Sequence, residues 1–298
     1  MSLPPLGKVA ARARLMLDSR LSVKPVKRKV RGIEMVLPRG HALPYFTHPG
    51  SVYFDNLVAL AKSLAGSEGE VTLLDIGANV GDTALVVLDA APGRAVCVEP
   101  DPHWNDYLQS NVGAMANVAV EHSVLVSPET DQTTGLKIAR AELGSSIVER
   151  TSLEDGLPTI TTTALREKYP ELENVRLVKS DTDGYDVQLV TAVSAAFLSS
   201  MPVIFFEFDP VPTRIVNPEV TPSELWPTLH ERGYERAVLW DNGGRLIGSF
   251  ATTELVERTA ELERTTKEER GYSFWDVAVA HRDDPAGLKA LEDAARVG

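Results

Sequence analysis

The sequence predicts an α/β protein with a doubly wound, Rossmann-like fold, in which helices cover both faces of a mostly parallel sheet. The first observation is that β-rich runs alternate with helical segments from residue 71 to residue 208, the pattern of repeated strand–helix–strand units. The second is that residues 71–76 are as continuously hydrophobic as a strand buried on both faces. This run leads into a glycine-containing turn, residues 77–81, where such folds bind ligands.

The alternation sets the expected order of elements. Strands are predicted at residues 71–76, 95–99, 118–125, 176–180 and 202–208. Helices are predicted between them at residues 83–88, 104–111, 163–168 and 186–197. Residues 127–160 form a polar stretch with mixed signals, which we interpret as a hairpin or an excursion.

The end of the chain follows a different pattern. A helix is predicted at residues 223–232, and strands at 236–240 and 245–250 flank the turn Asp241-Asn242-Gly243-Gly244. A helix at 253–268 then precedes a last β-rich run at 273–280. A late hairpin-like pair is typical of an antiparallel strand that joins the edge of a doubly wound sheet.

Charge divides the chain unevenly. Residues 1–40 hold ten basic and two acidic residues, so the net charge of −12 leaves −20 for residues 41–298. Such a basic arm could capture an anionic lipid, a nucleic acid or an acidic substrate, or it could pack on the acidic body as a helix and a strand. The alternation of Arg12, Arg14 and Arg20 with apolar residues favours packing as an amphipathic helix. We divide the chain into a basic arm and cap (1–65), a main domain (66–285) and a tail (286–298).

Composition excludes several classes of protein. The chain has 298 residues, of which 43% are hydrophobic and 24% charged, an ordinary globular balance that excludes wholesale disorder. The negative charge and 6% aromatic content argue against a nucleic-acid binder. One cysteine, Cys97, excludes an internal disulfide. No apolar stretch is long enough for a membrane span or a signal core, so a cytoplasmic enzyme is expected, of open oligomeric state.

The turn after the first strand carries the ligand prediction. It follows the pattern D-x-G-x-N-x-G, with Asp75 two residues before Gly77. Gly77 allows the backbone to turn sharply, and Gly81 allows the next helix to approach closely. A dinucleotide site would show G-x-G-x-x-G instead, and a carboxylate at position 75 would repel a pyrophosphate but attract an ammonium group. The turn therefore favours S-adenosylmethionine, the alternative being a plain strand–helix turn.

Glu99 supports the same cofactor. It ends the second strand, 18 residues after Gly81, where a carboxylate can accept hydrogen bonds from both ribose hydroxyls. A dehydrogenase would place an acid there too, and a solvated strand end is a further alternative. Ser123 and Val124, near the third strand, are expected to contact the adenine.

Three segments resemble the FkbM family of S-adenosylmethionine-dependent methyltransferases. They are residues 74–83 (LDIGANVGDT), residues 98–102 (VEPDP) with Leu108 and Asn111, and residues 177–186 (LVKSDTDGYD) with the strand 204–207 (IFFE). Together they cover about residues 70–210. The chain departs from the family at Asp183 and Asp186, where the family usually has Glu, and at Thr163-Ala164-Leu165, where the family has Thr-Leu-Asp.

The resemblance implies a seven-stranded, mostly parallel sheet with one antiparallel late strand. It also implies O-methylation of a small-molecule hydroxyl group, often on a sugar or natural product. The residues expected to bind the cofactor are Asp75, Gly77, Ala78, Asn79, Gly81, Asp82, Thr83, Glu99, Pro100, Ser123 and Val124.

Carboxylates gather at the ends of the fourth and fifth strands. Asp181 and Asp183 follow the fourth strand, and Glu207 and Asp209 end the fifth. One of them could act as a general base, two or three could bind Mg²⁺, or all could be structural. We assign Asp181, Asp183 and Glu207 as catalytic, with Asp181 facing the methyl acceptor, and we expect no resident metal.

Other residues near the cleft carry weaker signals. His48 and His103 lie in loops that could reach it, although surface or packing roles are more common for such residues. The aromatic run at residues 45–54 would form either a lid or a hydrophobic cap. Two alternative functions remain. A nicotinamide-dependent oxidoreductase would need a glycine pattern that this chain lacks. A non-catalytic binding module would typically have lost the cofactor turn, which is complete here.

Overall fold

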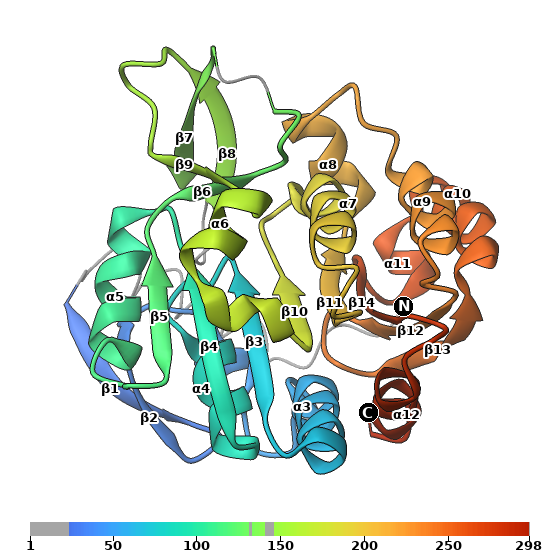
Figure 1. Ribbon diagram of the computed structural model, residues 1–298, viewed down its shortest axis with the longest axis horizontal. Coiled ribbons are helices and arrows are strands. Elements are labelled where there is room, and N and C mark those ends of the chain that lie inside the picture. Colours follow the sequence, from blue (N-terminus) through green and yellow to red (C-terminus); the bar gives the residue numbers. More distant parts are fainter. Residues whose placement is uncertain (1–23, 131–132, 141–145, 298) are drawn as a thin grey trace.

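The computed structural model describes residues 24–130, 133–140 and 146–297. Its central feature is a sheet of eight strands in the order β13-β12-β14-β11-β10-β3-β4-β5 (Figure 1). The strands are β3 (Val71–Ile76), β4 (Gly93–Val98), β5 (Val118–Glu121), β10 (Leu177–Ser180), β11 (Val203–Phe208), β12 (Arg236–Asp241), β13 (Leu246–Ala251) and β14 (Trp275–Ala280). Five neighbours, from β11 to β5, run parallel, whereas β14 is antiparallel to both β11 and β12.

This arrangement confirms the predicted fold class, with one correction. In the described part of the chain the sheet has eight strands rather than seven, because the turn after β12 folds β13 back antiparallel along the sheet edge. Gly244 makes this turn with a φ of +86°, in the left-handed region.

The strand order reverses at the centre of the sheet. The chain runs outward from β3 through β4 to β5, and then crosses back to β10 on the other side of β3. Ligands of open α/β sheets bind beside the carboxyl ends of the strands at such a reversal. The turn after β3 and the loop after β10 therefore meet at the place where a ligand is expected.

Helices cover both faces of the sheet, because alternate residues of the central strands point to opposite sides (Figure 1). Leu73 belongs to the core shared with one set of helices and Leu74 to the core shared with the other. The first set is α3 (Asp55–Glu68), α4 (Asp82–Ala90), α5 (Pro102–Val112) and α12 (Pro285–Ala294). The second includes α6 (Thr162–Lys168), α7 (Asp186–Ala196), α9 (Leu225–Glu231) and α10 (Leu255–Arg264).

The described part of the basic arm is an antiparallel hairpin, β1 (Pro25–Val30) and β2 (Ile33–Pro38). The Asn111 side chain on α5 accepts a hydrogen bond from the Val36 N–H and donates one to the Val36 carbonyl, which fixes the hairpin to the body. The predicted strand of the arm thus packs on the body. The predicted helix around Arg12, Arg14 and Arg20 lies outside the described residues.

The excursion at 127–160 contains a hairpin, as predicted, formed by β7 (Gly135–Arg140) and β8 (Ser146–Thr151). The strand predicted at 118–125 is two strands, β5 and β6 (Val124–Val126), and β6 pairs instead with β9 (Thr159–Thr161). The prediction of one strand is wrong because residues typical of strands continue from β5, which pairs with β4, into β6, which pairs with β9.

Two C-terminal elements also differ from expectation. The single helix predicted at 253–268 is divided into η4 (Thr252–Glu254), α10 and α11 (Lys267–Arg270), because Thr266 and Glu269 form a capping box that begins a new helix. Residues assigned to a tail lie mostly in α12, which packs on α3 and receives a hydrogen bond of 2.7 Å from Ser63 to Asp293.

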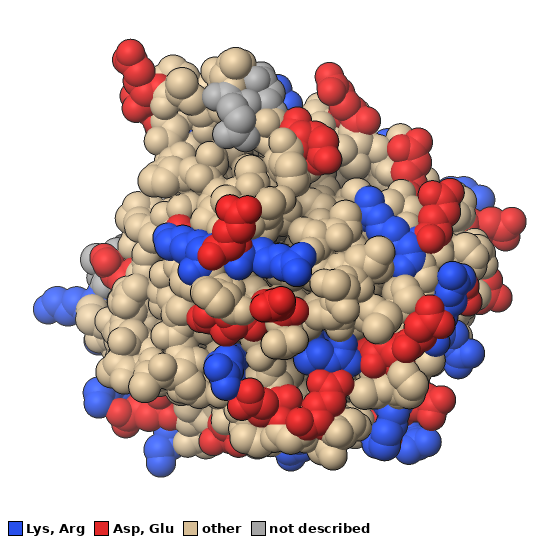
Figure 2. Space-filling model, viewed as in Figure 1, with Lys and Arg blue, Asp and Glu red and all other residues tan. Residues whose placement is uncertain are grey.

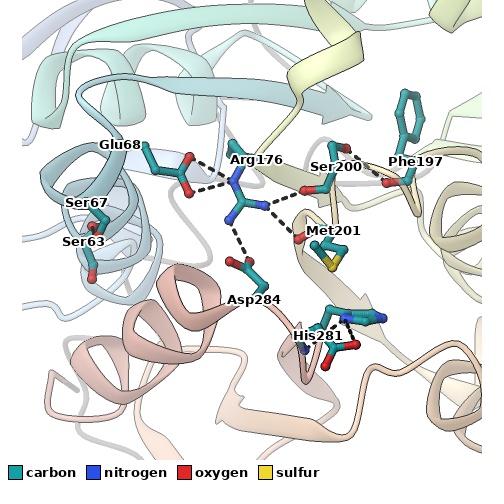
Figure 3. Close-up of polar contacts among 10 residues, drawn as sticks. Ser63, Ser67, Glu68, Arg176, Phe197, Ser200, Met201, His281 and Asp284 are labelled. Atoms are coloured by element: carbon teal, nitrogen blue, oxygen red, sulfur yellow. Dashed lines mark hydrogen bonds and ion pairs between the residues drawn. The ribbon is translucent and has the colours of Figure 1, made fainter.

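A partly buried arginine joins the amino end of β10 to its surroundings (Figure 3). The Arg176 guanidinium donates to Glu68 on α3, to Asp284 before α12, and to the backbone carbonyls of Ser200 and Met201. This network lies at the amino ends of the parallel strands, away from the carboxyl ends where ligands bind. It therefore stabilises the fold rather than binding a ligand.

Acidic and basic side chains are interspersed on the face shown in Figure 2. Among the described residues, no helix has both the length and the hydrophobicity needed to cross a membrane.

Candidate active site

Two cavities meet at the carboxyl ends of β3 and β10. The larger has a volume of about 460 Å³ and the smaller about 60 Å³. Both are lined by Gly77, Asn79, Asp181 and Asp183. A ligand in one cavity is therefore adjacent to a ligand in the other.

The turn after β3 fits tightly against the loop after β10. Gly77 has a φ of +71°, and a Cβ placed on it would lie 2.0 Å from the Asp181 carbonyl oxygen. Gly81 has a φ of +84°, and a Cβ there would lie 2.8 Å from Leu108 of α5. Both positions therefore require glycine, as the pattern predicted.

Asp75 lies beneath this turn rather than in a cavity. Its side chain is fully buried and lies 3.4 Å from the Lys179 ammonium, which also donates to the Gly77 carbonyl at 2.9 Å. Burial raises the pKa of Asp75 to about 6, although Lys179 opposes the shift. Burial alone would lower the pKa of Lys179, but the neighbouring carboxylates outweigh it and raise that pKa.

The ammonium group beside Asp75 is thus that of Lys179. Asp75 lines neither cavity. The predicted direct contact between Asp75 and a cofactor ammonium group does not match this position, because the carboxylate is fully buried beside Lys179 and reaches neither cavity. Asp75 instead fixes Lys179, which reaches to 3.7 Å from the Asp181 carboxylate.

Glu99 lines the smaller cavity and is held rigidly. One carboxylate oxygen accepts the Asn79 N–H and the other accepts the Asp101 N–H, both at 2.8 Å. Its side chain is only 5% exposed, so Glu99 is not a solvated strand end. Burial raises the pKa of Glu99 to about 7, and the two N–H groups oppose the shift.

The other predicted cofactor contacts divide between the two cavities and the scaffold. Asp82 and Thr83 line the larger cavity, and Pro100 and Val124 line the smaller. Ala78, Gly81 and Ser123 line neither. The Ser123 hydroxyl donates to Glu121 at 2.6 Å, so of the two residues predicted to contact adenine only Val124 reaches the cavity.

Asp186 supports the loop that carries the shared residues. Its buried carboxylate accepts hydrogen bonds from the Ser180 hydroxyl at 2.6 Å and from the Thr182 N–H at 3.1 Å. Asp183 within this loop has a φ of +52°. The shorter acid at 186 is therefore well accommodated, and the loop holds Asp181 and Asp183 at the junction of the cavities.

The larger cavity is strongly acidic. Glu207 on β11 and Asp276 on β14 both line it and are paired across the two antiparallel strands. Burial raises the pKa of each carboxyl group well above its usual range, and repulsion from Asp181 adds to both shifts. Sequence reasoning found Glu207 but missed Asp276, although an acid inside the apolar run 275–280 was a signal.

His41 is a second residue that the sequence analysis missed. It lines the larger cavity, and its Nδ1 accepts the Leu43 N–H at 3.2 Å. Nε2 therefore carries the proton and donates to the Asn79 side chain at 3.3 Å. Burial lowers the pKa of His41 to about 4, so the ring is neutral and positions Asn79. His48 and His103 line neither cavity.

The aromatic run contributes to the wall of the larger cavity. Phe46, Tyr53 and Phe54 line it, and the rings of Phe46 and Tyr53 are stacked with their centroids 5.4 Å apart. Tyr45 does not line it. Within the residues described, no group of three or more His, Cys, Asp or Glu side chains is arranged to hold a metal ion.

The fold is that of a Rossmann-like α/β protein with two adjacent cavities at the point where the strand order reverses. Residues 75–236, more than half of the chain, match the methyltransferase FkbM domain, and the chain belongs to this family. It is therefore an S-adenosylmethionine-dependent methyltransferase, which confirms the predicted family and cofactor.

The chain is also similar to several solved structures, among them the following three. Cofactor-bound Rv0187 from MTB is 14% identical, with 94% of this chain and 98% of that chain covered and a TM-score of 0.40. The O-methyltransferase from Bacillus cereus in complex with SAH is 12% identical, with coverages of 93% and 92% and a TM-score of 0.40. Methyltransferase FkbM from Methylobacillus flagellatus KT is 11% identical, with coverages of 51% and 40% and a TM-score of 0.30. These likenesses are distant, and no curated protein sequence matches the chain.

Proposed function

We propose that this enzyme methylates a hydroxyl group of a small molecule, such as a sugar or a natural product, and so acts as an O-methyltransferase. The observation that carries the proposal is the junction of the two cavities at Gly77, Asn79, Asp181 and Asp183. A methyl donor and an acceptor in adjacent cavities can meet in line, and such positioning is a major source of rate acceleration.

We assign the adenosine part of the cofactor to the smaller cavity, whose walls must move apart to admit this group because the cavity volume is only about 60 Å³. It is narrow and has apolar walls, including Val124 and Leu125, that suit a flat ring. Glu99 lines the same space, and each of its oxygens can accept a ribose hydroxyl in addition to its backbone N–H partner. Asp82 and Thr83, in the first turn of α4, would hold the methionyl end in the larger cavity. The cofactor, when bound, supplies an activated methyl group.

The larger cavity then receives the acceptor. The Asp181 side chain is 46% exposed and lies 3.7 Å from the Lys179 ammonium, which can orient it. Asp181 is therefore the base that we assign to the acceptor hydroxyl, with Asp183 and Glu207 as orienting groups. A positioned base contributes roughly 10²–10⁴-fold to the rate when a proton leaves during the reaction.

The test is to incubate the enzyme with carbon-13 methyl-labelled S-adenosylmethionine and a panel of hydroxylated small molecules. Product NMR distinguishes an O-methyl carbon from an N- or C-methyl carbon by its chemical shift. We expect O-methyl products and a large loss of turnover in Asp181→Asn, with little change in affinity for S-adenosylhomocysteine. Labelled products that carry only N- or C-methyl groups would contradict O-methylation, and a fully active Asp181→Asn variant would remove the base assignment.

A further inference from the structure

Glu207 and Asp276 form a pair of carboxylates on the wall of the larger cavity. They are partners across β11 and β14, so their side chains leave neighbouring strands at the same level. Both line the cavity and are partly exposed. Within residues 24–130, 133–140 and 146–297, no group forms a hydrogen bond or an ion pair with either carboxylate. Each carboxylate therefore lines the cavity without a partner from the described chain, and a ligand in the cavity can supply one.

The charged side chains that line the cavity indicate the sign of the charge that such a ligand would carry. Its described lining includes six carboxylates but a single ammonium group, that of Lys179. The six are Asp82, Asp181, Asp183, Glu207, Asp209 and Asp276. Lys179 is already engaged with Asp75 and with the Gly77 carbonyl, on the side of the cavity formed by β3 and β10. The side formed by β11 and β14 therefore holds acidic groups without a matching cation among the described residues. A cation bound there would favour their ionised forms and offset the repulsion that contributes to their raised pKa.

The neighbouring rings suit the same kind of ligand. Tyr53, Phe205 and Phe274 line the cavity together with the two carboxylates. The face of an aromatic ring attracts a cation, most strongly where water is excluded. Burial and the surrounding carboxylates raise the pKa of Tyr53, so its hydroxyl stays neutral and can donate a hydrogen bond. Carboxylates and aromatic faces on one wall are complementary to an organic cation.

We propose that the methyl acceptor carries a protonated amine and that Glu207 and Asp276 bind it. The substrate class is then a hydroxylated amine, such as an amino sugar or an amino alcohol, whose hydroxyl group lies toward Asp181. This inference rests on the proposed function, because it places the acceptor in the larger cavity. A neutral polyol is the competing class.

The experiment measures binding to the enzyme saturated with S-adenosylhomocysteine at neutral pH. Titration calorimetry compares three probes of similar size: D-glucosamine, N-acetyl-D-glucosamine and D-glucose. We expect glucosamine to bind at least about tenfold more tightly than either neutral sugar, a difference of about 1.4 kcal/mol. Glu207→Gln and Asp276→Asn should each remove most of this preference. Glu257→Gln, at an exposed position on α10, is the matched control and should keep it.

Thermal unfolding of each variant shows whether it remains folded. Equal binding of the three sugars, absent binding of glucosamine, or a preference that persists in both cavity variants would overturn the proposal. Failure of the parent to bind S-adenosylhomocysteine would instead contradict the proposed function. Intact cofactor binding without a preference for the amine contradicts only the amine assignment.

Discussion

Replacement of Gly77 by alanine tests the close approach of the turn after β3 to the loop after β10. The new Cβ would lie 2.0 Å from the Asp181 carbonyl oxygen, a group of the backbone that cannot rotate away. The left-handed conformation at Gly77 costs a residue with a Cβ about 1–2 kcal/mol. Overpacking against the loop adds about 1–3 kcal/mol, so the free energy of unfolding should fall by roughly 2–5 kcal/mol.

Gly271→Ala is the matched control. Gly271 ends α11 with a φ of +84°, and nothing lies within 4 Å of the position of its Cβ. In this variant the free energy of unfolding should therefore fall only by the cost of the left-handed backbone conformation, about 1–2 kcal/mol. The difference between the two variants isolates the contact with Asp181.

Urea unfolding and calorimetric titration with S-adenosylhomocysteine measure both consequences. In Gly77→Ala the loop with Asp181 must move at the junction of the cavities, so cofactor affinity should fall about tenfold or more, whereas Gly271→Ala should bind as the parent does. Equal destabilisation by the two substitutions, together with unchanged affinity in Gly77→Ala, would refute the reasoning.

Three further perturbations separate cofactor binding, catalysis and stability. Ionised Glu99 accepts the ribose hydroxyls, so affinity for S-adenosylhomocysteine should rise as the pH increases from about 6 to 7, by up to about tenfold per pH unit. Titration calorimetry measures this dependence, and Glu99→Gln should abolish it. The same raised pKa gives Glu99 a contribution to stability that is present at low pH and is lost as the pH rises through about 7. With Asp181 as the base and no resident metal, turnover of the parent should survive EDTA in a product assay; loss with recovery on adding Mg²⁺ would contradict this. Arg176→Met leaves the carboxylates of Glu68 and Asp284 without their ion-pair partner, so the free energy of unfolding in urea should fall by about 3–5 kcal/mol while the folded variant keeps its cofactor affinity. A smaller loss than in Gly271→Ala would contradict the stabilising role of the Arg176 network.

The local pattern predicted the glycine turn after β3 and the position of Glu99 beside it, because both depend on contiguous segments. Gly77 and Gly81 are required by backbone geometry that the pattern D-x-G-x-N-x-G encodes directly. Glu99 ends its strand beside this turn because successive parallel strands place their carboxyl ends at one edge. These features depend on neighbours in sequence or on adjacent strands.

Features that depend on distant partners were missed. Asp276 reaches the cavity only because β14 inserts between β11 and β12, and the sequence does not encode which strands become neighbours. His41 reaches Asn79 from the segment before α2 (Leu43–Phe46), far from it in the chain. Asp75 was assigned to the cofactor because its partner, Lys179, approaches from another strand. Ser123 likewise turns toward Glu121, where Lys168 and Tyr169 also bind.

A crystal structure of the enzyme with S-adenosylhomocysteine tests the central claim most directly. It should show the adenosine in the smaller cavity with its ribose hydroxyls on Glu99. The sulfur atom should lie at the junction formed by Gly77, Asn79, Asp181 and Asp183, facing the larger cavity. Adenosine in the larger cavity, or a sulfur atom that does not face Asp181, would contradict the assignment of the two cavities to donor and acceptor.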